Sequence, residues 1–291
     1  MPRTDRGPRR QVTSLRREVA VVARLDLAEV LRSRWLVFCL LVHAVLAALF
    51  VLVGLRESGV VGFTGMGRAL MSWSHTLLFL LPLLALSATG QVVNTARDDG
   101  SLELLLSNPV SRTGYFVGIS LVRVAALVAP LLVAMPTMAL VGAQTFGQEV
   151  PWGFLIRGMV VSTALLLCFV AIGLCLSTFV RNQAKALMFT ILVWAAGVAF
   201  IDFGLVGLML QWEMPPSAVF ALAMLNPVQC SRLALLSAVQ PELSTFGPVG
   251  YFLANRIGST GLLVLGIGWP LLLGSTAWVW SLRAFRRRDL L

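Results

Sequence analysis

The sequence predicts an all-α integral membrane protein with six transmembrane helices and with both termini on the cytoplasmic side. Of its 291 residues, 58% are hydrophobic and only 12% are charged, whereas soluble domains carry about 25% charged residues. The mean hydropathy is +0.86, and several apolar runs reach the ~20 residues that cross a ~30 Å hydrocarbon core. The basic residues are concentrated on one side of these runs.

Each predicted span is an apolar run of at least 21 residues that lies between polar or charged stretches. The longer runs leave room for tilt in the bilayer. The predicted spans are Trp35–Leu55, Leu70–Val93, Tyr115–Gly142, Phe154–Val180, Ala186–Leu210 and Gly258–Leu282.

The distribution of basic residues predicts the orientation. Of the 23 Lys and Arg residues, 17 lie on the side that includes the N-terminus and Arg123 lies deep within a span. The other five lie on the opposite side, and one of them, Arg157, lies just inside the outer end of its span. The positive-inside rule therefore places the segment 1–34, the loop 97–114 and the tail 283–291 in the cytoplasm. Contact of these arginines with anionic lipid headgroups accounts for the net charge of +10 without a nucleic-acid partner.

Segment 1–34 is an Arg-rich tail that ends in a predicted interfacial helix. Ala20, Ala23, Leu27 and Leu31 fall on one helical face, and arginines occupy the rest of the surface. A helix with this pattern lies in the plane of the lipid headgroups before the chain enters the first span. The alternative is a charged tail of modest helicity.

The segment 211–257 before the last span contains an apolar piece, Ala218–Val239, that is long enough for a seventh span. Asn226 and Pro227 interrupt it, and a seventh span would place the basic C-terminal tail outside. We therefore predict outer-face or re-entrant helices in this segment. Asn226 is a good N-cap and Pro227 suits the first helical position, so one helix is predicted to begin there.

A charged and strongly patterned stretch occupies the predicted cytoplasmic loop 97–114. Asp98–Ser101 has the composition of a helix start, because its carboxylate and hydroxyl groups can cap free backbone N–H groups. The leucines on one face of the following helix are Leu102, Leu105 and Leu106. Pro109 ends this helix. The pattern indicates a short amphipathic helix on the inner surface, and the alternative is a loop that floats on lipid.

The same stretch carries a family resemblance. Gly100-Ser-Leu-Glu-Leu-Leu-Leu-Ser-Asn-Pro-Val-Ser-Arg112 resembles the Gly-Thr-Leu-Glu-Leu-Leu-Leu-Ser-x-Pro-Val-Ser-Arg stretch of ABC-2 type transporter permeases. It is most similar to those of the NosY type, which serve the maturation of nitrous oxide reductase. Leu225-Asn-Pro-Val-Gln-Cys-Ser-Arg-Leu233 is similar to the Leu-Asn-Pro segment of this family, although Cys230 stands where an apolar or aromatic residue is expected. The six-span layout extends the resemblance over most of the chain.

The resemblance implies a permease subunit of an ATP-binding cassette transporter in the bacterial inner membrane. Its implied partners are a second copy of the permease, two copies of a cytoplasmic ABC ATPase and a periplasmic accessory protein. The short cytoplasmic helix would be the coupling helix that docks the ATPase. The residues implied to contact the ATPase or to orient this helix are Arg97, Asp98, Asp99, Glu103, Arg112 and Arg181. For the NosY type, the implied role is assembly of the copper sites of nitrous oxide reductase.

The sequence excludes ATP hydrolysis through a P-loop in this chain. A P-loop needs a Gly-rich turn that ends in Lys-Ser or Lys-Thr, and the only lysine, Lys185, lies within Gln183-Ala-Lys-Ala186. We therefore expect a permease subunit that is not an enzyme and has no cofactor of its own, with ATP and Mg²⁺ bound by the separate ATPase. The alternative is a secondary transporter or channel that has no ATPase partner.

Three charged residues, Arg123, Arg157 and Asp202, fall within predicted spans, where charge by default indicates function or pairing. Arg157 and Asp202 lie at similar depth near the outer side and are predicted to pair. Arg123 is expected to extend its side chain toward the inner surface. Gly114 and Gly118, at the inner end of the third span, form a GxxxG pattern that permits a close helix contact.

No metal site is predicted. The two histidines, His43 and His75, lie in different spans, and neither they nor the methionines have a chelating spacing. Ordinary packing is therefore preferred over a copper path. Three of the four cysteines lie in apolar runs, where a free Cys packs as a small hydrophobe.

Overall fold

The computed structural model describes residues 14–57, 65–147, 149–200, 216–239 and 257–287, and their regular structure is helical. The elements are α1 (Leu15–Arg32), α2 (Trp35–Glu57), α3 (Gly65–Thr89), α4 (Val92–Asp98), α5 (Ser101–Ser107), α6 (Arg112–Phe146), α7 (Trp152–Phe179), α8 (Gln183–Ala195), the π-helix η1 (Ala196–Phe200), α10 (Pro216–Leu225), α11 (Pro227–Val239) and α13 (Gly258–Arg287). Asp202 and the outer part of the predicted fifth span lie outside the described residues.

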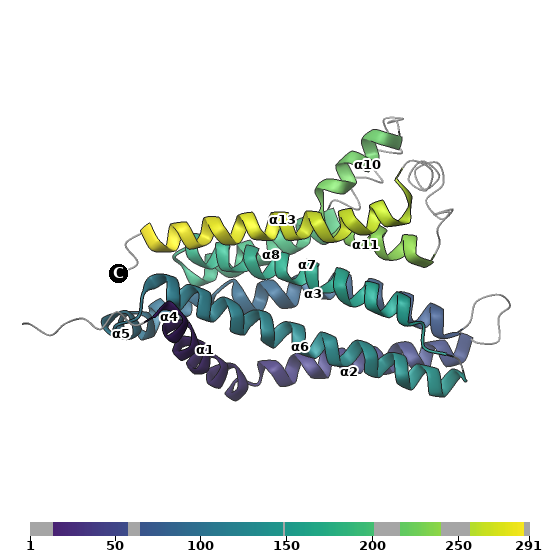
Figure 1. The fold of residues 1–291 in the computed structure, drawn as a ribbon, viewed down its shortest axis with the longest axis horizontal. Helices are drawn as coiled ribbons and strands as arrows, with labels where there is room; N and C mark the ends of the chain where they lie inside the picture. The colour runs from purple at the N-terminus through teal and green to yellow at the C-terminus, as the bar shows by residue number, and fades with distance from the viewer. Residues whose placement is uncertain (1–13, 58–64, 148, 201–215, 240–256, 288–291) are drawn as a thin grey trace, which may run out of the picture.

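The long helices α2, α3, α6, α7 and α13 pack side by side along the long axis of the molecule (Figure 1). Four helices are long and apolar enough to cross a membrane over the described residues: Thr76–Asp98, Arg112–Thr145, Trp152–Phe179 and Gly258–Arg287. Each overlaps one predicted span. Two shorter apolar helices, Val37–Leu46 and Gln183–Val198, cover parts of the predicted first and fifth spans.

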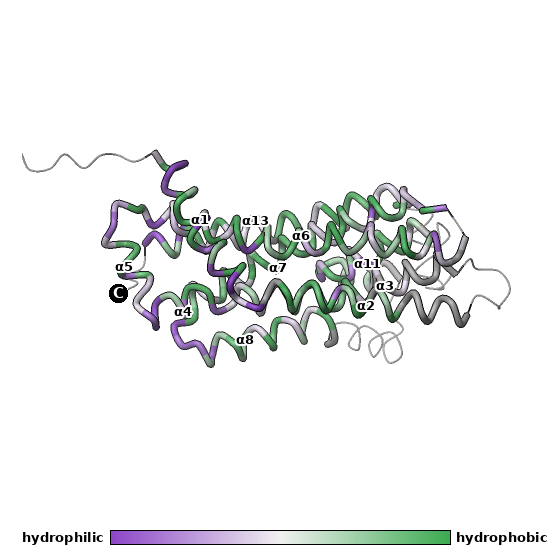
Figure 2. The backbone as a smooth tube through the Cα atoms, turned by 90° about the horizontal axis from the view of Figure 1, so that it is seen from below, coloured by the Kyte–Doolittle hydropathy of each residue, from purple (hydrophilic) through white to green (hydrophobic). Residues whose placement is uncertain are grey.

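Polar residues collect at one end of this bundle. Figure 2 shows hydrophilic segments around α1, α4 and α5, and mainly hydrophobic backbone along the middle of the long helices. The C-terminal end of α13 lies at the same end, and α10 projects from the opposite half (Figure 1). The segments that carry the predicted cytoplasmic charges are therefore gathered together by the fold.

The predicted second span is interrupted near its inner end, where α3 stops at Thr89 and α4 starts at Val92. The backbone N–H of Val93 donates to Ser177 Oγ of α7 at 2.8 Å. Glycine allows close approach at the break, because a Cβ on Gly90 would lie 2.5 Å from Thr190 Oγ1 of α8. At this break, the hydrogen bond to Ser177 and the close contact with Thr190 hold the chain in place of helical hydrogen bonds.

Helix α7 forms the centre of the bundle and packs against α3, α6, α11 and α13. Most of its residues are buried, including Cys168 and Phe169. Close contact with α13 requires glycine there, because a Cβ on Gly274 would lie 2.8 Å from Cys168 Cα. A Cβ on Gly173 would collide with the Thr89 side chain of α3. Small residues therefore set the distances between these helices.

The predicted N-terminal helix forms as α1 and packs against α6. The GxxxG contact is confirmed, because a Cβ on Gly118 would lie 2.7 Å from Val22 Cγ1, and one on Gly114 would lie 2.8 Å from Glu18 Oε2. Val22 packs in this contact and is buried. Leu31, from the predicted apolar face, is 59% exposed. Of that face, Ala23 packs against the buried cluster that includes Val122 and Ala126 of α6, whereas Leu27 and Leu31 are exposed.

The predicted helix start at Asn226-Pro227 is confirmed. Asn226 Oδ1 accepts a hydrogen bond from Val228 N at 2.9 Å, so Asn226 caps α11. Cys230 is a buried residue of α11, and a Cβ on Gly266 of α13 would lie 2.8 Å from its carbonyl oxygen. The thiol of Cys230 lies 3.1 Å from Met224 O. A small residue suits this crowded position.

Candidate functional site

The turn between α4 and α5 brings the acidic residues of the loop 97–114 to the start of a short helix. Gly100 has φ 75°, a left-handed conformation that disfavours residues with a Cβ. Asp99 Oδ1 accepts a hydrogen bond from Ser101 N at 2.9 Å. Hydrogen bonds from the Ser101 hydroxyl and backbone hold the pKa of Asp99 below its ordinary value. Asp99 is therefore a charged group that ends one helix and starts the next.

Helix α5 has a buried face and an exposed face. Leu102 is fully buried, and Leu105 and Leu106 pack against the same core. Glu103 is exposed, and Leu104 beside it is 70% exposed. The exposed leucine was not singled out from the sequence, although helical spacing places it away from the other three leucines. An acidic side chain and an apolar one therefore form the free surface of this helix.

The end of the loop is held by contacts from both ends of the chain. Ser111 caps α6, since its Oγ accepts from Gly114 N at 3.0 Å. Glu18 of α1 accepts hydrogen bonds from the Ser111 hydroxyl and from Ser111 N, the latter at 3.0 Å. Arg112 Nη1 donates to Arg286 O of α13 at 3.3 Å. Glu18 has a positioning contact that sequence reasoning missed, because its partner is distant in the chain.

Arg97 and Arg181 lie close enough for their positive charges to repel. Arg97 Nε and Nη1 are buried and have no hydrogen-bond partner among the described residues. Asp98 is the nearby acidic group that attracts Arg97, and Arg181 is exposed. The fold thus brings together two of the arginines singled out in separate loops. An anionic group from outside the chain would complete the hydrogen bonding of this pair.

The charged residues of the predicted spans have different surroundings. Arg123 Nη2 donates to Asp26 Oδ1 of α1 at 2.7 Å, with side-chain exposures of 16% and 8%. Asp26 is a partner that the sequence analysis did not name. Arg157 is exposed near the start of α7. The pairing of Arg157 with Asp202 stays a prediction, because Asp202 lies outside the described residues.

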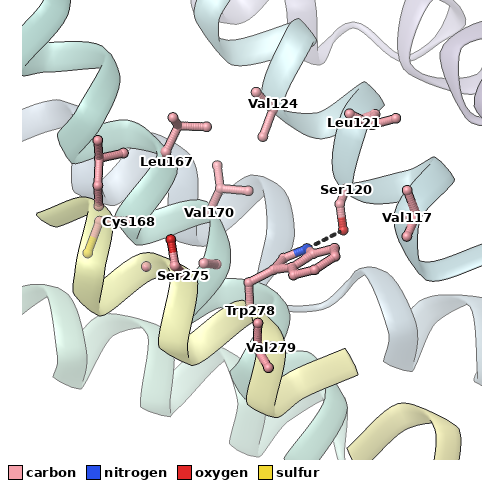
Figure 3. Close-up of a pocket in the computed structure, with 13 residues that line it drawn as sticks. Val117, Ser120, Leu121, Val124, Leu167, Cys168, Val170, Ser275, Trp278 and Val279 are labelled. Atoms are coloured by element: carbon pink, nitrogen blue, oxygen red, sulfur yellow. Dashed lines mark hydrogen bonds between the residues drawn. The ribbon is translucent and has the colours of Figure 1, made fainter. Parts of the chain in front are cut away.

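A hollow of about 570 Å³ lies between α6, α7 and α13 (Figure 3). Val117, Leu121, Val124 and other uncharged side chains line it. The indole Nε1 of Trp278 donates to Ser120 Oγ at 3.0 Å (Figure 3), which fixes the ring at the wall. The lining can hold apolar groups and offers no charge to select an ion.

Within the described part of the chain, no group of three or more His, Cys, Asp or Glu side chains could hold a metal ion. His43 is buried, and its Nδ1 lies 2.7 Å from Cys39 O. Because a carbonyl oxygen can only accept, Nδ1 is the protonated ring nitrogen and donates this hydrogen bond. The singled-out charged residues of the loops gather instead at the polar end of the bundle, which is built from α1, α4, α5, the start of α6 and the end of α13.

Comparison with known families gives the class of this chain. Residues 20–290 match the model of the ABC-2 family transporter proteins. The match covers nearly the whole chain, so the protein belongs to this family of transporter permeases, which are non-catalytic membrane subunits.

Two relatives indicate which type of permease within this family the chain is similar to. The chain is 32% identical over 233 residues to a protein of Stutzerimonas stutzeri named probable ABC transporter permease protein NosY, covering 78% of this chain and 84% of the relative. It is 30% identical over 230 residues to the protein of the same name from Pseudomonas aeruginosa PAO1, covering 75% and 82%. The chain is therefore a NosY-like permease, as the loop 97–114 predicts.

Proposed function

We propose that two copies of this chain form the membrane part of an ATP-driven transporter in the bacterial inner membrane, each docked to one ABC ATPase. Each copy crosses the membrane six times with both termini in the cytoplasm. ATP and Mg²⁺ are bound by the ATPase, and helix α5 is the coupling helix. Arg97, Asp98, Asp99, Arg112 and Arg181 form the rest of the docking surface or orient it.

The observation that carries this proposal is the two-faced character of α5. One face is anchored by buried Leu102, and the other presents Glu103 and the 70% exposed Leu104 at the polar end of the bundle. An exposed apolar side chain next to a charge is typical of the centre and rim of a small protein interface. The surface is rigidly held, so a partner can push on it.

The contacts behind α5 supply a mechanical route into the membrane. Val93, in the helix before the coupling turn, is hydrogen-bonded to Ser177 of α7 at 2.8 Å. Gln183 Nε2 donates to Gln91 Oε1 at 3.1 Å and ties α8 to the same break. Closure of the ATPase dimer on ATP would displace α5 and α4, and α7 and α8 would follow because packed cores transmit displacement. This motion would open or close a path between the two permease copies.

The proposed cargo follows the NosY relatives. We propose a role in assembling the copper sites of nitrous oxide reductase, through supply of a sulfur species or through help with copper-site assembly, together with a periplasmic accessory protein. This assignment rests on the likeness to the relatives alone, because one scaffold can serve many cargoes.

The docking proposal is tested with the permease and its cognate ATPase expressed together. Glu103→Lys reverses the exposed charge of α5, and Arg97→Glu reverses one charge of the arginine pair. We expect each variant to weaken ATPase binding about tenfold or more, the size of a lost interfacial charge contact. The measurements are ATPase recovered with the tagged permease and ATP hydrolysis in the reconstituted complex.

Glu149→Lys is the matched control, since Glu149 is an exposed glutamate away from the loop 97–114. It should leave both ATPase recovery and ATP hydrolysis at the wild-type level. The coupling assignment fails if Glu103→Lys and Arg97→Glu also leave the complex and its ATP hydrolysis intact. Recovery of no ATPase with the wild-type chain would favour a secondary transporter instead.

A further inference from the structure

A second cavity, of about 480 Å³, lies between α1, the α3–α5 segment and α6. Its walls are the interfacial helix on one side and the coupling segment on the other. Apolar residues such as Val22, Leu105 and Ile119 line part of it, and charged residues line the rest. The cavity therefore lies at the polar end of the bundle.

The cavity collects charges of both signs. Asp26 and Glu29 come from α1, Asp99 comes from the α4–α5 turn, and Arg123 comes from α6. All four line the same cavity as Tyr115, so they face a common space. Three carboxylates against one guanidinium make this space acidic, although the chain as a whole carries a net charge of +10.

Two buried polar atoms that face this cavity, one of Asp26 and one of Arg123, have no hydrogen-bond partner among the described residues. Asp26 is 8% exposed, and its Oδ2 has no hydrogen-bond partner among the described residues, although Oδ1 binds Arg123. Arg123 Nε is likewise buried without a partner. Burial raises the pKa of Asp26 even though Arg123 lies beside it. A buried acceptor and a buried donor that are both unsatisfied are costly unless a ligand pairs with them.

We propose that this cavity binds a phospholipid headgroup in which a primary ammonium stands next to a phosphate, the phosphoethanolamine class. The ammonium donates to Asp26, Glu29 and Asp99, and the phosphate lies toward Arg123. The apolar wall receives the glycerol and the first acyl carbons. Asp26, Glu29, Asp99 and Arg123 line a single cavity of about 480 Å³, which has room for a headgroup.

A bound lipid would connect α1 to the coupling segment, because the cavity has one wall from each. The inference depends on the cavity and its charges. Asp99 is shared with the proposed docking surface, but lipid retention is measured on the permease without its ATPase, so the two proposals can fail separately. The same ammonium chemistry could come from a soluble amine, and the experiment separates these two sources.

The test uses the full-length chain, purified in mild detergent from vesicles that contain phosphatidylethanolamine, phosphatidylcholine and phosphatidylglycerol in equal amounts. Lipid retained by the protein is quantified by mass spectrometry. We expect phosphatidylethanolamine to be enriched over phosphatidylcholine, whose methylated headgroup has no N–H donor. The double variant Glu29→Gln with Asp99→Asn should lower this enrichment about tenfold, the effect of losing charge-assisted hydrogen bonds.

Both substituted residues are exposed, so this variant is expected to fold. Glu149→Gln serves as the matched control and should retain phosphatidylethanolamine like the wild type. Equal retention of the three lipids, or equal retention by the double variant, would overturn the proposal. Loss of retained lipid on adding soluble ethanolamine, with ethanolamine bound in its place, would assign the site to a soluble amine and overturn the lipid assignment.

Discussion

The ion pair between Asp26 and Arg123 predicts an unequal response to removal of its two partners. The pair joins the interfacial helix α1 to α6, and its side chains are only 8% and 16% exposed. Removing one partner of a buried pair costs about 3–5 kcal/mol, because the remaining charge is left uncompensated. The two remaining charges differ, however, in whether they can be neutralised.

Asp26→Asn leaves Arg123 without its carboxylate. Arginine keeps its proton throughout the accessible pH range, so the buried charge persists. We expect a loss of about 3 kcal/mol in the free energy of unfolding, at the low end of the range because Arg123 retains some solvent contact. Because burial raises the pKa of Asp26 in the folded wild type, the wild type gains stability as the pH falls, whereas the Asn variant does not. This loss should therefore be at least as large near pH 5 as near pH 7.

Arg123→Gln leaves Asp26, whose pKa burial already raises. The lone Asp26 carboxylate can take up a proton, and the free energy of that protonation is the most its burial can cost. For an unfolded pKa of about 3.9, this limit is about 4 kcal/mol near pH 7 and about 1.5 kcal/mol near pH 5. The folded state then binds the proton more tightly than the unfolded state, so lowering the pH stabilises it. We expect a loss of about 3 kcal/mol near pH 7 that shrinks to at most about 1.5 kcal/mol near pH 5.

The assay is SDS-induced unfolding of the purified chain in mixed micelles, followed by tryptophan fluorescence at the two pH values and referred to the wild type at each. Arg24→Gln, on the exposed surface of α1, is the control and should change stability by less than about 0.5 kcal/mol. The reasoning is refuted if the two variants lose equal stability at both pH values, or if neither loses more than the control.

Three further predictions concern packing, capping and the outer charges. Gly274→Ala should destabilise the chain by about 1–3 kcal/mol, since its Cβ would lie 2.8 Å from the α7 backbone, and Gly268→Ala on an open face of α13 should cost less than about 1 kcal/mol in the same unfolding assay. Asn226→Ala should cost about 1–2 kcal/mol through loss of the α11 cap, and an unchanged unfolding midpoint would contradict this role. Exchanging the charges of Arg157 and Asp202 should restore the folded yield lost in either single charge reversal, and a double variant no better than the singles would rule out the pair.

The sequence was most informative where the signal is local. Apolar runs and the placement of arginines predict a helical membrane protein, and each of the four long apolar helices overlaps one predicted span. The helix start at Asn226 follows from residues that are adjacent in the chain. The GxxxG pattern indicated a close contact, although it could not name α1 as the helix that Gly118 meets.

The sequence could not predict contacts between residues far apart in the chain. Arg123 and Asp26 are 97 positions apart, and the local pattern of α1 drew attention to its apolar face instead. The break at Gly90 was missed for the same reason, since it depends on Ser177 and Thr190 from two later helices. The same limit applies to the acidic cavity, whose four charges come from three separate segments.

The sequence alone therefore determined the class of structure, the family, and the short charged helix α5 with Glu103 on its surface, because hydrophobicity, charge and capping act between near neighbours. Only the tertiary structure decided which face of α1 packs inward, that Arg97 lies near Arg181, and that Asp26 forms an ion pair with Arg123. Those outcomes depend on how close the helices can approach. That distance is set by glycines and small side chains facing one another across the bundle, which no single stretch of sequence contains.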